Sequence, residues 1–394
     1  MDASLFISRR LRFKGKIAMA SIAVSFLVMI IAVSVSSGFR HAIRDGISSV
    51  SGDIQLLPLD MNMLDESSPV ESDASYLPYL QDMDGVQNVV PVIYRAGIVR
   101  HDEEIHGILV KGVPTQELPF ENPDSLTLAV SIPRRLSDMM GLGEGDKMLT
   151  YFMGTKVRAR QFNIVSIHDS ILETDDRIVV YADLADMQRL NGWNDNQVSA
   201  MEIMLDRDAR DEKRLSEITA DVATAVYAYT AEDETTVLAT SCISRYPQIF
   251  DWLNLMDFNV LFILVLMTIV AGFNMISGLL IMLFENISTI GLLKTLGMTD
   301  RSIAKVFLSS SAVLTIKGMA IGNALAIIFC IVQSTTHILK LNPVNYFVSF
   351  VPVHPDFGLI LAADIIAFAA IMLLLLIPCL FISKVDPAET VRVR

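Results

Sequence analysis

The sequence predicts a helical membrane protein with four transmembrane helices and a large α+β extracytoplasmic domain inserted between the first helix and the second. Two observations carry this prediction. Hydrophobic residues make up 52% of the chain and charged residues only 19%, below the roughly 25% of ordinary soluble domains. The apolar residues also gather in four long runs, and about 20 such residues cross a bilayer as a helix.

The four runs are nearly free of charge. Residues 17–35, 258–284 and 318–336 contain no charged side chain, and the fourth run, residues 359–382, is interrupted by Asp364. Because backbone groups in lipid need partners within the same segment, we expect each run to be a helix. With their flanks, we assign the transmembrane helices to residues 17–39, 258–284, 306–336 and 358–383.

The first run has an alternative interpretation as the core of a cleaved signal peptide, since five basic residues lie between positions 9 and 16. The run is longer than the roughly 7–15 residues of a signal core. No small-x-small cleavage site closes it before Gly38. We therefore favour a retained membrane anchor.

Basic residues near the helix ends predict the orientation, because cytoplasmic loops are enriched in Lys and Arg. They precede the first helix, follow the fourth, and lie between the second and third, whereas the connection between the third and fourth contains only Lys340. We therefore expect residues 1–16, 285–305 and 384–394 in the cytoplasm. Residues 40–257 and the short loop 337–357 then lie on the outer side.

The outer segment is strongly acidic. Residues 40–257 hold 18 Lys and Arg against 37 Asp and Glu, as a solvated acidic surface would. This balance argues against nucleic acid as a partner. Cys242 is the one cysteine of this segment, so the segment is expected to fold without an internal disulfide.

Alternating strand-like and helical stretches predict an α+β fold for the outer segment. We expect strands at 52–57, 89–99, 104–113, 126–132, 148–152, 158–167, 178–181 and 198–205. We expect helices at 74–83, 133–140, 184–190 and 210–226. Residues 40–50 and 246–257 are expected to extend the first and second helices outward as stalks.

Patterns for catalysis are mostly missing from the sequence. It contains neither a P-loop nor a G-x-S-x-G elbow, and the stretch 141–147 is better interpreted as a tight turn. His101 and His106 flank three acidic residues, but the segment predicts strand–turn–strand rather than a zinc site on one helical face. We assign no catalytic, cofactor-binding or metal-binding residue.

Two ionisable residues fall within membrane runs, where such residues are functional candidates. Lys317 lies about ten residues inside the third helix from the cytoplasmic end, and Asp364 a few residues inside the fourth from the outer end. Their different depths argue against a direct pair. We favour a snorkelling Lys317 and an Asp364 at a wet interface over a proton path.

The order of several motifs carries a family resemblance. They are AGFNMISG at 271–278, LLIMLFE at 279–285, IGLLKTLGM at 290–298, IAKVF at 303–307, FDWLNL at 250–255, IPRRL at 132–136, GLGEGDK at 141–147, DPAETVR at 386–392 and LFISRR at 5–10. Together they resemble the permease subunits of lipoprotein-releasing ABC transporters, members of the FtsX-like superfamily that also contains macrolide-exporter-type permeases. The resemblance covers essentially the whole chain.

The resemblance implies partners and a division of labour. Two permeases, identical or related, would pair in the bacterial inner membrane with the large domain in the periplasm, each docked on a cytoplasmic ATPase subunit that binds ATP and Mg²⁺. This chain would be non-catalytic and hold no cofactor. Residues 285–299 would be the ATPase-coupling helix, with an apolar face at i, i+3, i+6. The coupling residues are Glu285, Ile287, Ile290, Leu293, Lys294, Leu296 and Gly297.

The same resemblance implies the substrate and its entry. In the lipoprotein-releasing family an acylated protein enters sideways from the outer leaflet, between the first and second helices of the permease pair. The matching helices here carry apolar residues that suit acyl chains and would equally suit membrane lipid. The candidate cavity residues are Phe26, Met29, Val33, Phe258, Phe262 and Met267.

The sequence departs from the family at two places. Those permeases usually have Glu-Lys at the start of the coupling segment, whereas this chain has Glu285-Asn286. One subunit type captures a soluble periplasmic carrier through a proline-bearing hairpin, whereas residues 151–160 here are short and lack proline. This second departure argues against carrier capture by that hairpin and leaves a carrier open as a partner.

Two alternatives stay open. The first is ATP-driven export of a periplasmic peptide, toxin or siderophore, although exporters of that type often carry a fused ATPase that this sequence lacks. The second is regulation of a cell-wall hydrolase, as in the cell-division relatives. The size of the outer segment argues against that second alternative.

Overall fold

The computed structural model describes residues 16–64, 68–101, 104–121, 127–154, 157–169, 178–342, 346 and 348–380. The chain divides into two compact units. A helical unit contains the chain up to residue 41, residues 252–340 and the chain from residue 351, and an outer unit contains residues 42–251 and 341–350. The expected cytoplasmic termini, with the motifs at 5–10 and 386–392, lie outside the described residues.

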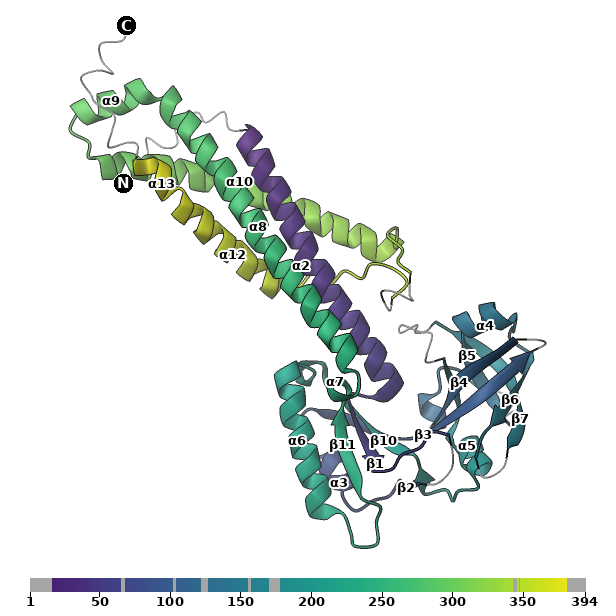
Figure 1. The fold of residues 1–394 in the computed structure, drawn as a ribbon. Helices are drawn as coiled ribbons and strands as arrows, with labels where there is room; N and C mark the ends of the chain where they lie inside the picture. The colour runs from purple at the N-terminus through teal and green to yellow at the C-terminus, as the bar shows by residue number, and fades with distance from the viewer. Residues whose placement is uncertain are drawn as a thin grey trace. The chain divides into compact units, whose positions relative to one another are not determined.

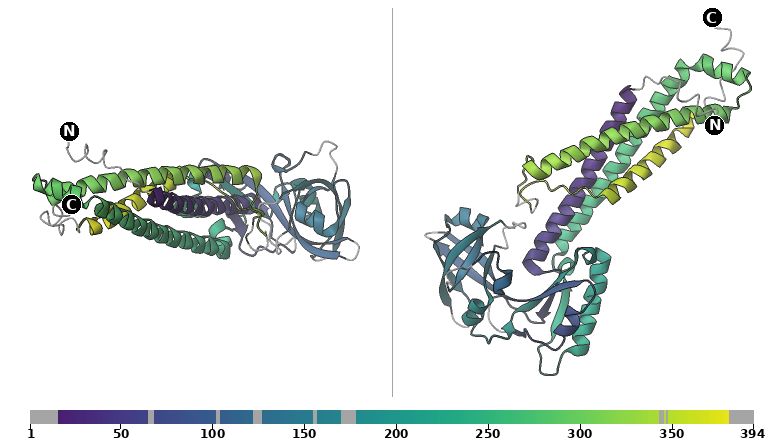
Figure 2. Two further views of the ribbon diagram at one scale, coloured as in Figure 1. Left: turned by 90° about the horizontal axis from the view of Figure 1, so that it is seen from above. Right: turned by 180° about the vertical axis from the view of Figure 1, so that it is seen from behind.

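Four helices in the described part of the chain are long and apolar enough to cross a membrane, which confirms the predicted fold class. They are α2 (Lys16–Ser51), α8 (Pro247–Glu285), α10 (Asp300–Thr336) and α12 (Phe357–Leu374), the last continued by α13 (Leu376–Cys379). The short helix α9 (Ile287–Thr295) joins α8 to α10. Figures 1 and 2 show α2 and α8 running side by side.

The helix bounds differ from the predicted spans in physically simple ways. The expected stalks are parts of the helices themselves, because α2 runs without a break to Ser51 and α8 begins at Pro247. The fourth helix is interrupted, since α12 ends at Leu374 and α13 continues it to Cys379, and residues 381–383 of the predicted span lie outside the described residues. Pro378 explains this break, because it has no N–H to donate to the carbonyl of Leu374.

Small residues let α10 pack closely on α2 within the helical unit. A Cβ added to Gly322 would lie 2.5 Å from the Ala23 carbonyl oxygen, and one added to Gly318 would lie 2.8 Å from the Ile22 side chain. The same face of α10 continues with the fully buried Ala326. This small-xxx-small spacing brings two helix backbones together in the manner that is common between membrane helices.

The outer unit contains a nine-stranded sheet, a two-stranded sheet and five helices in its described residues (Figure 1). The strands are β1 (Ile54–Pro58), β2 (Val70–Glu71), β3 (Val86–His101), β4 (Glu104–Val113), β5 (Ala129–Pro133), β6 (Lys147–Phe152), β7 (Arg158–His168), β8 (Val179–Asp183), β9 (Gln197–Val198), β10 (Ala200–Leu205) and β11 (Val237–Ser241). The helices are α3 (Leu77–Gln81), α4 (Arg134–Met140), α5 (Leu184–Asn191), α6 (Glu212–Tyr229) and α7 (Cys242–Arg245).

The long strand β3 belongs to two sheets at once. Its first half pairs with β10 in the open order β11-β1-β10-β3, and its second half pairs with β4. The order β3-β4-β8-β5-β7-β6 closes into a barrel because β3 also pairs with β6, from Gly97↔Phe152 to Arg100↔Leu149. Gly97 permits this closure, since a Cβ there would lie 2.8 Å from the Thr150 side chain.

Most of the expected elements of the outer segment are present. The hairpin of β6 and β7 is confirmed, as is the helix near 210–226, whose predicted apolar residues Leu215, Ile218, Val222 and Val226 are buried. The strand expected at 198–205 is two strands, β9 and β10, on different sheets. Strands β2 and β11 were not predicted, because two or five residues without clear alternation give little signal.

Candidate functional site

The predicted coupling segment forms a compact turn between two long helices. α8 ends at Glu285, and Gly297, with a φ of +89°, terminates α9. The Gly297 N–H donates to the Lys294 carbonyl at 3.0 Å, and the Met298 N–H donates to the Leu293 carbonyl at 3.0 Å, which is a Schellman motif. Thr299 then caps α10. The helix in the predicted coupling segment 285–299 is therefore shorter than that segment, from Ile287 to Thr295.

The face of α9 that we expected to meet a partner is instead turned inward. Ile290 is only 1% exposed, and the partly buried Leu293 packs with it in the core of the helical unit, near Ile303 and Phe307. The physical reason is that an amphipathic segment buries its apolar stripe on the nearest covering surface. Here that surface is the start of α10.

The outward face of α9 is mixed in character. Leu292 is 56% exposed, Leu296 is 73% exposed, and Ser288 and Thr289 beside them are also exposed. Ile287 lies at the edge of this face, 38% exposed, and Glu285 at the preceding helix end is exposed as well. Lys294 is not part of it, because its ammonium pairs with Asp300 at 3.0 Å and its side chain is 11% exposed.

The candidate cavity residues separate into two groups that do not face each other in one chain. Phe26, Met29 and Val33 of α2 are buried within the helical unit. Phe258 and Phe262 of α8 are 66% and 63% exposed. Met267 is partly buried and packs against the core around Phe26 and Met29. The six residues therefore do not share one surface of this chain.

A polar cluster joins α2 to α8 within the helical unit. Ser36 donates to Asp257 at 2.5 Å, and Arg40 pairs with the other oxygen of the same carboxylate. Next to it the rings of Phe39 and Trp252 pack edge to face at 5.8 Å. The Arg40 and Asp257 side chains are 34% and 38% exposed, so this contact is accessible to solvent or headgroups.

The two ionisable residues of the membrane runs lie in different surroundings. Asp364 is buried, 7% exposed, and accepts a hydrogen bond from Asn323 at 2.5 Å. One carboxylate oxygen of Asp364 therefore has a polar partner on α10, and the other is buried without a partner among the described residues. Lys317 is exposed on the outside of α10, as a snorkelling side chain is.

The last turn of α2 is fixed to the sheet of the outer unit by a buried ion pair that the sequence analysis did not identify. Lys111 of β4 donates to Glu202 of β10 at 2.9 Å, and the two side chains are 3% and 1% exposed. The Lys111 ammonium also donates to the carbonyls of Val50 at 2.9 Å and Ser49 at 3.3 Å. It thereby caps the end of α2, where carbonyls lack partners and a cation is favoured.

Two tyrosines complete this joint. The Tyr94 hydroxyl donates to the Glu202 carboxylate and lies 3.2 Å from the Val50 carbonyl, while the Tyr181 hydroxyl donates to the Ser49 carbonyl at 3.4 Å. Burial, reinforced by the charge of Glu202, raises the pKa of Tyr94 and raises that of Tyr181 to about 12. Both rings therefore stay neutral donors at physiological pH.

A second set of bonds fixes the segment that leaves α2. Asp53, 1% exposed, accepts from Ser48 at 2.5 Å and from the Leu205 N–H at 2.9 Å, and it pairs with Arg210 at 3.2 Å. Cys242 at the start of α7 donates its backbone N–H to the Asp53 carbonyl at 2.9 Å. Burial raises the pKa of the Cys242 thiol to about 12, which makes that thiol unreactive.

A Ser–His contact in the barrel resembles a catalytic pair only at first sight. Ser131 and His168 lie 2.8 Å apart, and burial lowers the pKa of His168 to about 4. Ser131 is fully buried, so its hydroxyl cannot reach a substrate. His101 and His106 lie on the two arms of the β3–β4 hairpin, as strand–turn–strand requires. Among the described residues, no group of three or more potential metal ligands gathers.

The described residues thus form four long apolar helices and a separate outer α/β unit. A family profile described as FtsX-like permease C-terminal matches residues 261–387, which include α9 and most of the last three long helices. Residues 261–387 are therefore similar to the C-terminal part of FtsX-like permeases. The match includes the α8–α9–α10 turn.

Curated relatives extend the similarity over nearly the whole chain. It is 21% identical to "Lipoprotein-releasing system transmembrane protein LolC" of Neisseria meningitidis serogroup B, over 96% of this chain and 94% of that protein. It is 22% identical to the protein of the same name from Xylella fastidiosa strain Temecula1, over 98% and 95%. The chain is thus similar to LolC-type permeases over nearly its whole length.

Solved structures resemble the outer unit only distantly. The periplasmic region of MacB from Actinobacillus actinomycetemcomitans matches with a TM-score of 0.33 and 10% identity, covering 52% of this chain and 95% of that one. The extracellular domain of YknZ from Gram-positive bacteria matches with a TM-score of 0.30 and 12% identity, covering 48% and 99%.

Proposed function

We propose that this permease extracts acylated proteins from the outer leaflet of a bacterial inner membrane, with energy supplied by ATP and Mg²⁺ in a separate cytoplasmic ATPase. The observation that carries the proposal is the similarity to two LolC proteins over at least 96% of the chain. In this proposal the outer unit is periplasmic, both termini are cytoplasmic, and a second permease, identical or related, completes the complex.

The outward face of α9 is proposed as the surface that the ATPase binds. It presents Leu292 and Leu296 one helical turn apart, in the center of an exposed and otherwise polar surface. Two exposed leucines beside hydroxyl side chains form an apolar center with a polar rim, the usual anatomy of a protein interface. The inward residues Ile290 and Leu293 then act by holding α9 against α10.

The joint at the end of α2 is proposed as the element that carries movement into the outer unit. α2 is one continuous helix, and its last turn is held by Lys111, Tyr94 and Tyr181. A rigid helix with a bonded end transmits rotation and translation to the element bonded there, as in rigid-body switching. No small-molecule channel is required for such transmission.

The coupling surface is tested by purification of the tagged full-length permease in mild detergent, with mass spectrometry of retained proteins. We expect wild type to retain an ATPase, and Leu292→Glu or Leu296→Glu to lower its recovery by about tenfold or more, since a charge is placed in an apolar contact. Leu238→Glu, at an exposed leucine of β11, is the matched control. Equal ATPase recovery with all variants would contradict the assignment.

The substrate is tested by depletion of the permease and fractionation of inner and outer membranes. Accumulation of lipoproteins in the inner membrane is the expected result, and normal sorting would overturn the proposal. A periplasmic adaptor copurifying with the ATPase, without lipoprotein, would favour the exporter alternative instead.

A further inference from the structure

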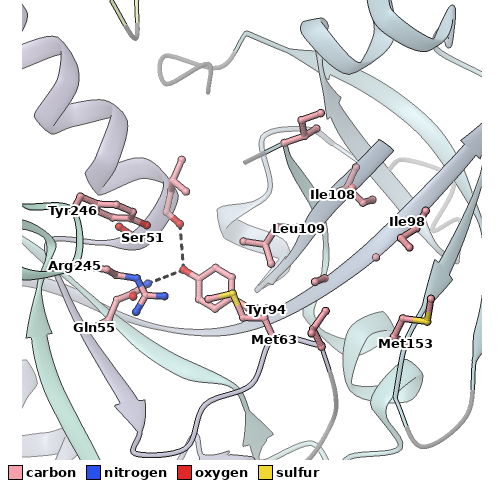
Figure 3. A pocket seen from close by; sticks show the side chains of 16 residues that line it. Ser51, Gln55, Met63, Tyr94, Ile98, Ile108, Leu109, Met153, Arg245 and Tyr246 are labelled. Atoms are coloured by element: carbon pink, nitrogen blue, oxygen red, sulfur yellow. Dashed lines mark hydrogen bonds between the residues drawn. The ribbon is translucent and has the colours of Figure 1, made fainter. Parts of the chain in front are cut away.

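The outer unit contains a pocket of about 580 Å³ that the coupling and transmission roles do not use. It lies beside the end of α2, the junction of α7 with α8, and the segment around Met63 and Leu64, over one face of the β3–β4 hairpin (Figure 3). This volume falls within the roughly 300–1,000 Å³ of small-molecule sites.

The floor of the pocket is an aliphatic strip on two paired strands. In the β3–β4 register Ala96 opposes Leu109 and Ile98 opposes Gly107, and opposed residues project to the same face. Met63 closes one side, and its position is fixed because its carbonyl accepts the Ala96 N–H at 2.7 Å. Met153 and Ile178 add further flexible and branched aliphatic surface. Such a lining suits a hydrocarbon chain.

A glycine keeps the center of this floor open. A Cβ added to Gly107 would meet no heavy atom within 4 Å, whereas one added to Gly97, which precedes the opposing Ile98 on β3, would meet the Thr150 side chain at 2.8 Å. The two positions therefore require glycine for different reasons. Gly97 makes room for a strand of the barrel, and Gly107 leaves empty space in the pocket. A glycine within a strand often marks the close approach of a ligand.

Polar groups gather at one side of the pocket. Figure 3 shows Ser51, Gln55, Arg245 and Tyr246 at this side and Ile98, Ile108 and Met153 at the other. Gln55 is 2% exposed, and its Oε1 has no hydrogen-bond partner. The Arg245 guanidinium forms neither an ion pair nor a hydrogen bond with a described residue, although acidic side chains outnumber basic ones about twofold in this segment.

We propose that this pocket binds one fatty-acyl group, with its hydrocarbon chain along the β3–β4 floor and its carbonyl end at Arg245. The guanidinium donates to the carbonyl oxygen of either a carboxylate or an amide, and where the acyl group is amide-linked the Oε1 of Gln55 accepts from the amide N–H. The aliphatic strip excludes water from the chain. One side of the pocket thus binds the polar end of the ligand, and the other side binds its hydrocarbon chain. Small-molecule sites fix the orientation of a ligand in this way.

Two sources supply this chemistry. One is a free fatty acid or lysolipid of the membrane, and the other is the acylated end of a protein substrate. The second source rests on the proposed function, whereas the site itself does not.

The test is photo-crosslinking of the full-length permease in lipid nanodiscs. Two diazirine-bearing probes are used separately, palmitic acid and an N-palmitoylated peptide, and the labelled peptides are mapped by mass spectrometry. We expect at least one probe to label residues 94–98 or 107–109. Gly107→Leu should lower that labelling by about tenfold or more, since its side chain displaces several CH₂ groups of the ligand.

Matched variants separate the site from effects on folding. Gly143→Leu places the same side chain in an open turn away from the pocket and should label as wild type. Arg245→Gln should lower labelling, and Arg207→Gln, at an exposed arginine, should not. Unchanged melting of each variant shows that it is folded.

The outcomes are distinct. Labelling by the fatty acid alone supports the site with a membrane source, and labelling by the acylated peptide supports it with the substrate as source. Labelling confined to the transmembrane helices, or labelling that Gly107→Leu leaves unchanged, overturns it. Lipoprotein sorting in depleted cells is measured independently. Failure of the pocket proposal therefore does not contradict the proposed function, and failure of the proposed function does not contradict the pocket.

Discussion

The two ion pairs that fix α2 differ in their access to water. Within the helical unit, Arg40 pairs with Asp257 while both side chains are about one-third exposed. Within the outer unit, Lys111 pairs with Glu202 while both are at most 3% exposed. Exposed pairs contribute about 0–1 kcal/mol, whereas breaking a buried pair costs about 3–5 kcal/mol because a charge is left without water or partner.

This difference indicates where α2 can move relative to its neighbours and where it is held. The Arg40–Asp257 contact can open and be replaced by water at little cost, so α2 and α8 can shift against each other there. The joint of Lys111, Glu202 and Tyr94 with the α2 carbonyls cannot open without stranding buried charges and donors. Movement of α2 should therefore carry the sheet with it.

The largest effect is expected when one partner of the buried pair is removed. Glu202→Ala should lower the stability of the outer unit by about 3–5 kcal/mol, since Lys111 is then buried without a counter-charge. The double variant Lys111→Met/Glu202→Met should recover most of this loss. Thermal unfolding of the full-length permease in detergent measures the stability of both variants. A Glu202→Ala variant as stable as wild type would contradict the assignment of a rigid joint.

The next comparison sets the inward face of α9 against its outward face. Ile290→Ala should cost about 2–5 kcal/mol, as for other buried isoleucines. Leu292→Ala, at an exposed position, should change stability by less than about 0.5 kcal/mol and yet weaken binding of the ATPase. The two readouts are chemical unfolding and copurification, and a reversed pattern would mean that the outward face is not the docking surface.

The buried His168 predicts how the stability of the outer unit depends on pH. The folded state holds the pKa of His168 at about 4, whereas an unfolded histidine titrates near 6.5. The folded state therefore binds fewer protons between these values, and stability falls as pH drops from about 6.5 to about 4, by at most about 3 kcal/mol.

The measurement is the difference in unfolding free energy between wild type and His168→Gln across this pH range. The variant should lose stability less steeply on acidification. His106→Gln is the control for removal of an imidazole from the same domain. Parallel curves for wild type and His168→Gln would show that burial of His168 is not what sets the acid response.

The smallest effect is expected at the exposed pair. Arg40→Met should change stability by no more than about 1 kcal/mol, because water screens the Asp257 carboxylate when its partner is lost. Thermal unfolding at low and at high salt checks this. A loss of stability as large as that of Glu202→Ala would contradict the expected difference between the Arg40–Asp257 pair and the Lys111–Glu202 pair.

Local signals in the sequence predicted the helical architecture well. Length and apolarity identify a membrane helix without knowledge of its neighbours, and all four were found. The helical spacing of Leu215, Ile218, Val222 and Val226 likewise predicted the buried face of α6. Such features depend on residues a few positions apart.

Features that depend on distant partners could not be predicted. β3 looks like one ordinary strand, and only its pairing with both β10 and β6 reveals the open sheet and the closed barrel. Lys111 and Glu202 are each one charge within an apolar strand, which was the available signal for the joint. In α9 two of the three predicted apolar residues, Ile290 and Leu293, pack inward, and the surface that covers them depends on where α10 begins.

The central claim is that this chain releases acylated proteins from a membrane with ATP hydrolysed by a partner. The most direct measurement is release of a fluorescent lipoprotein from proteoliposomes that contain the permease with its copurified ATPase. We predict release that requires ATP and is lost in the Leu292→Glu permease. An ATPase that is bound and active while the lipoprotein stays in the vesicles would contradict the account.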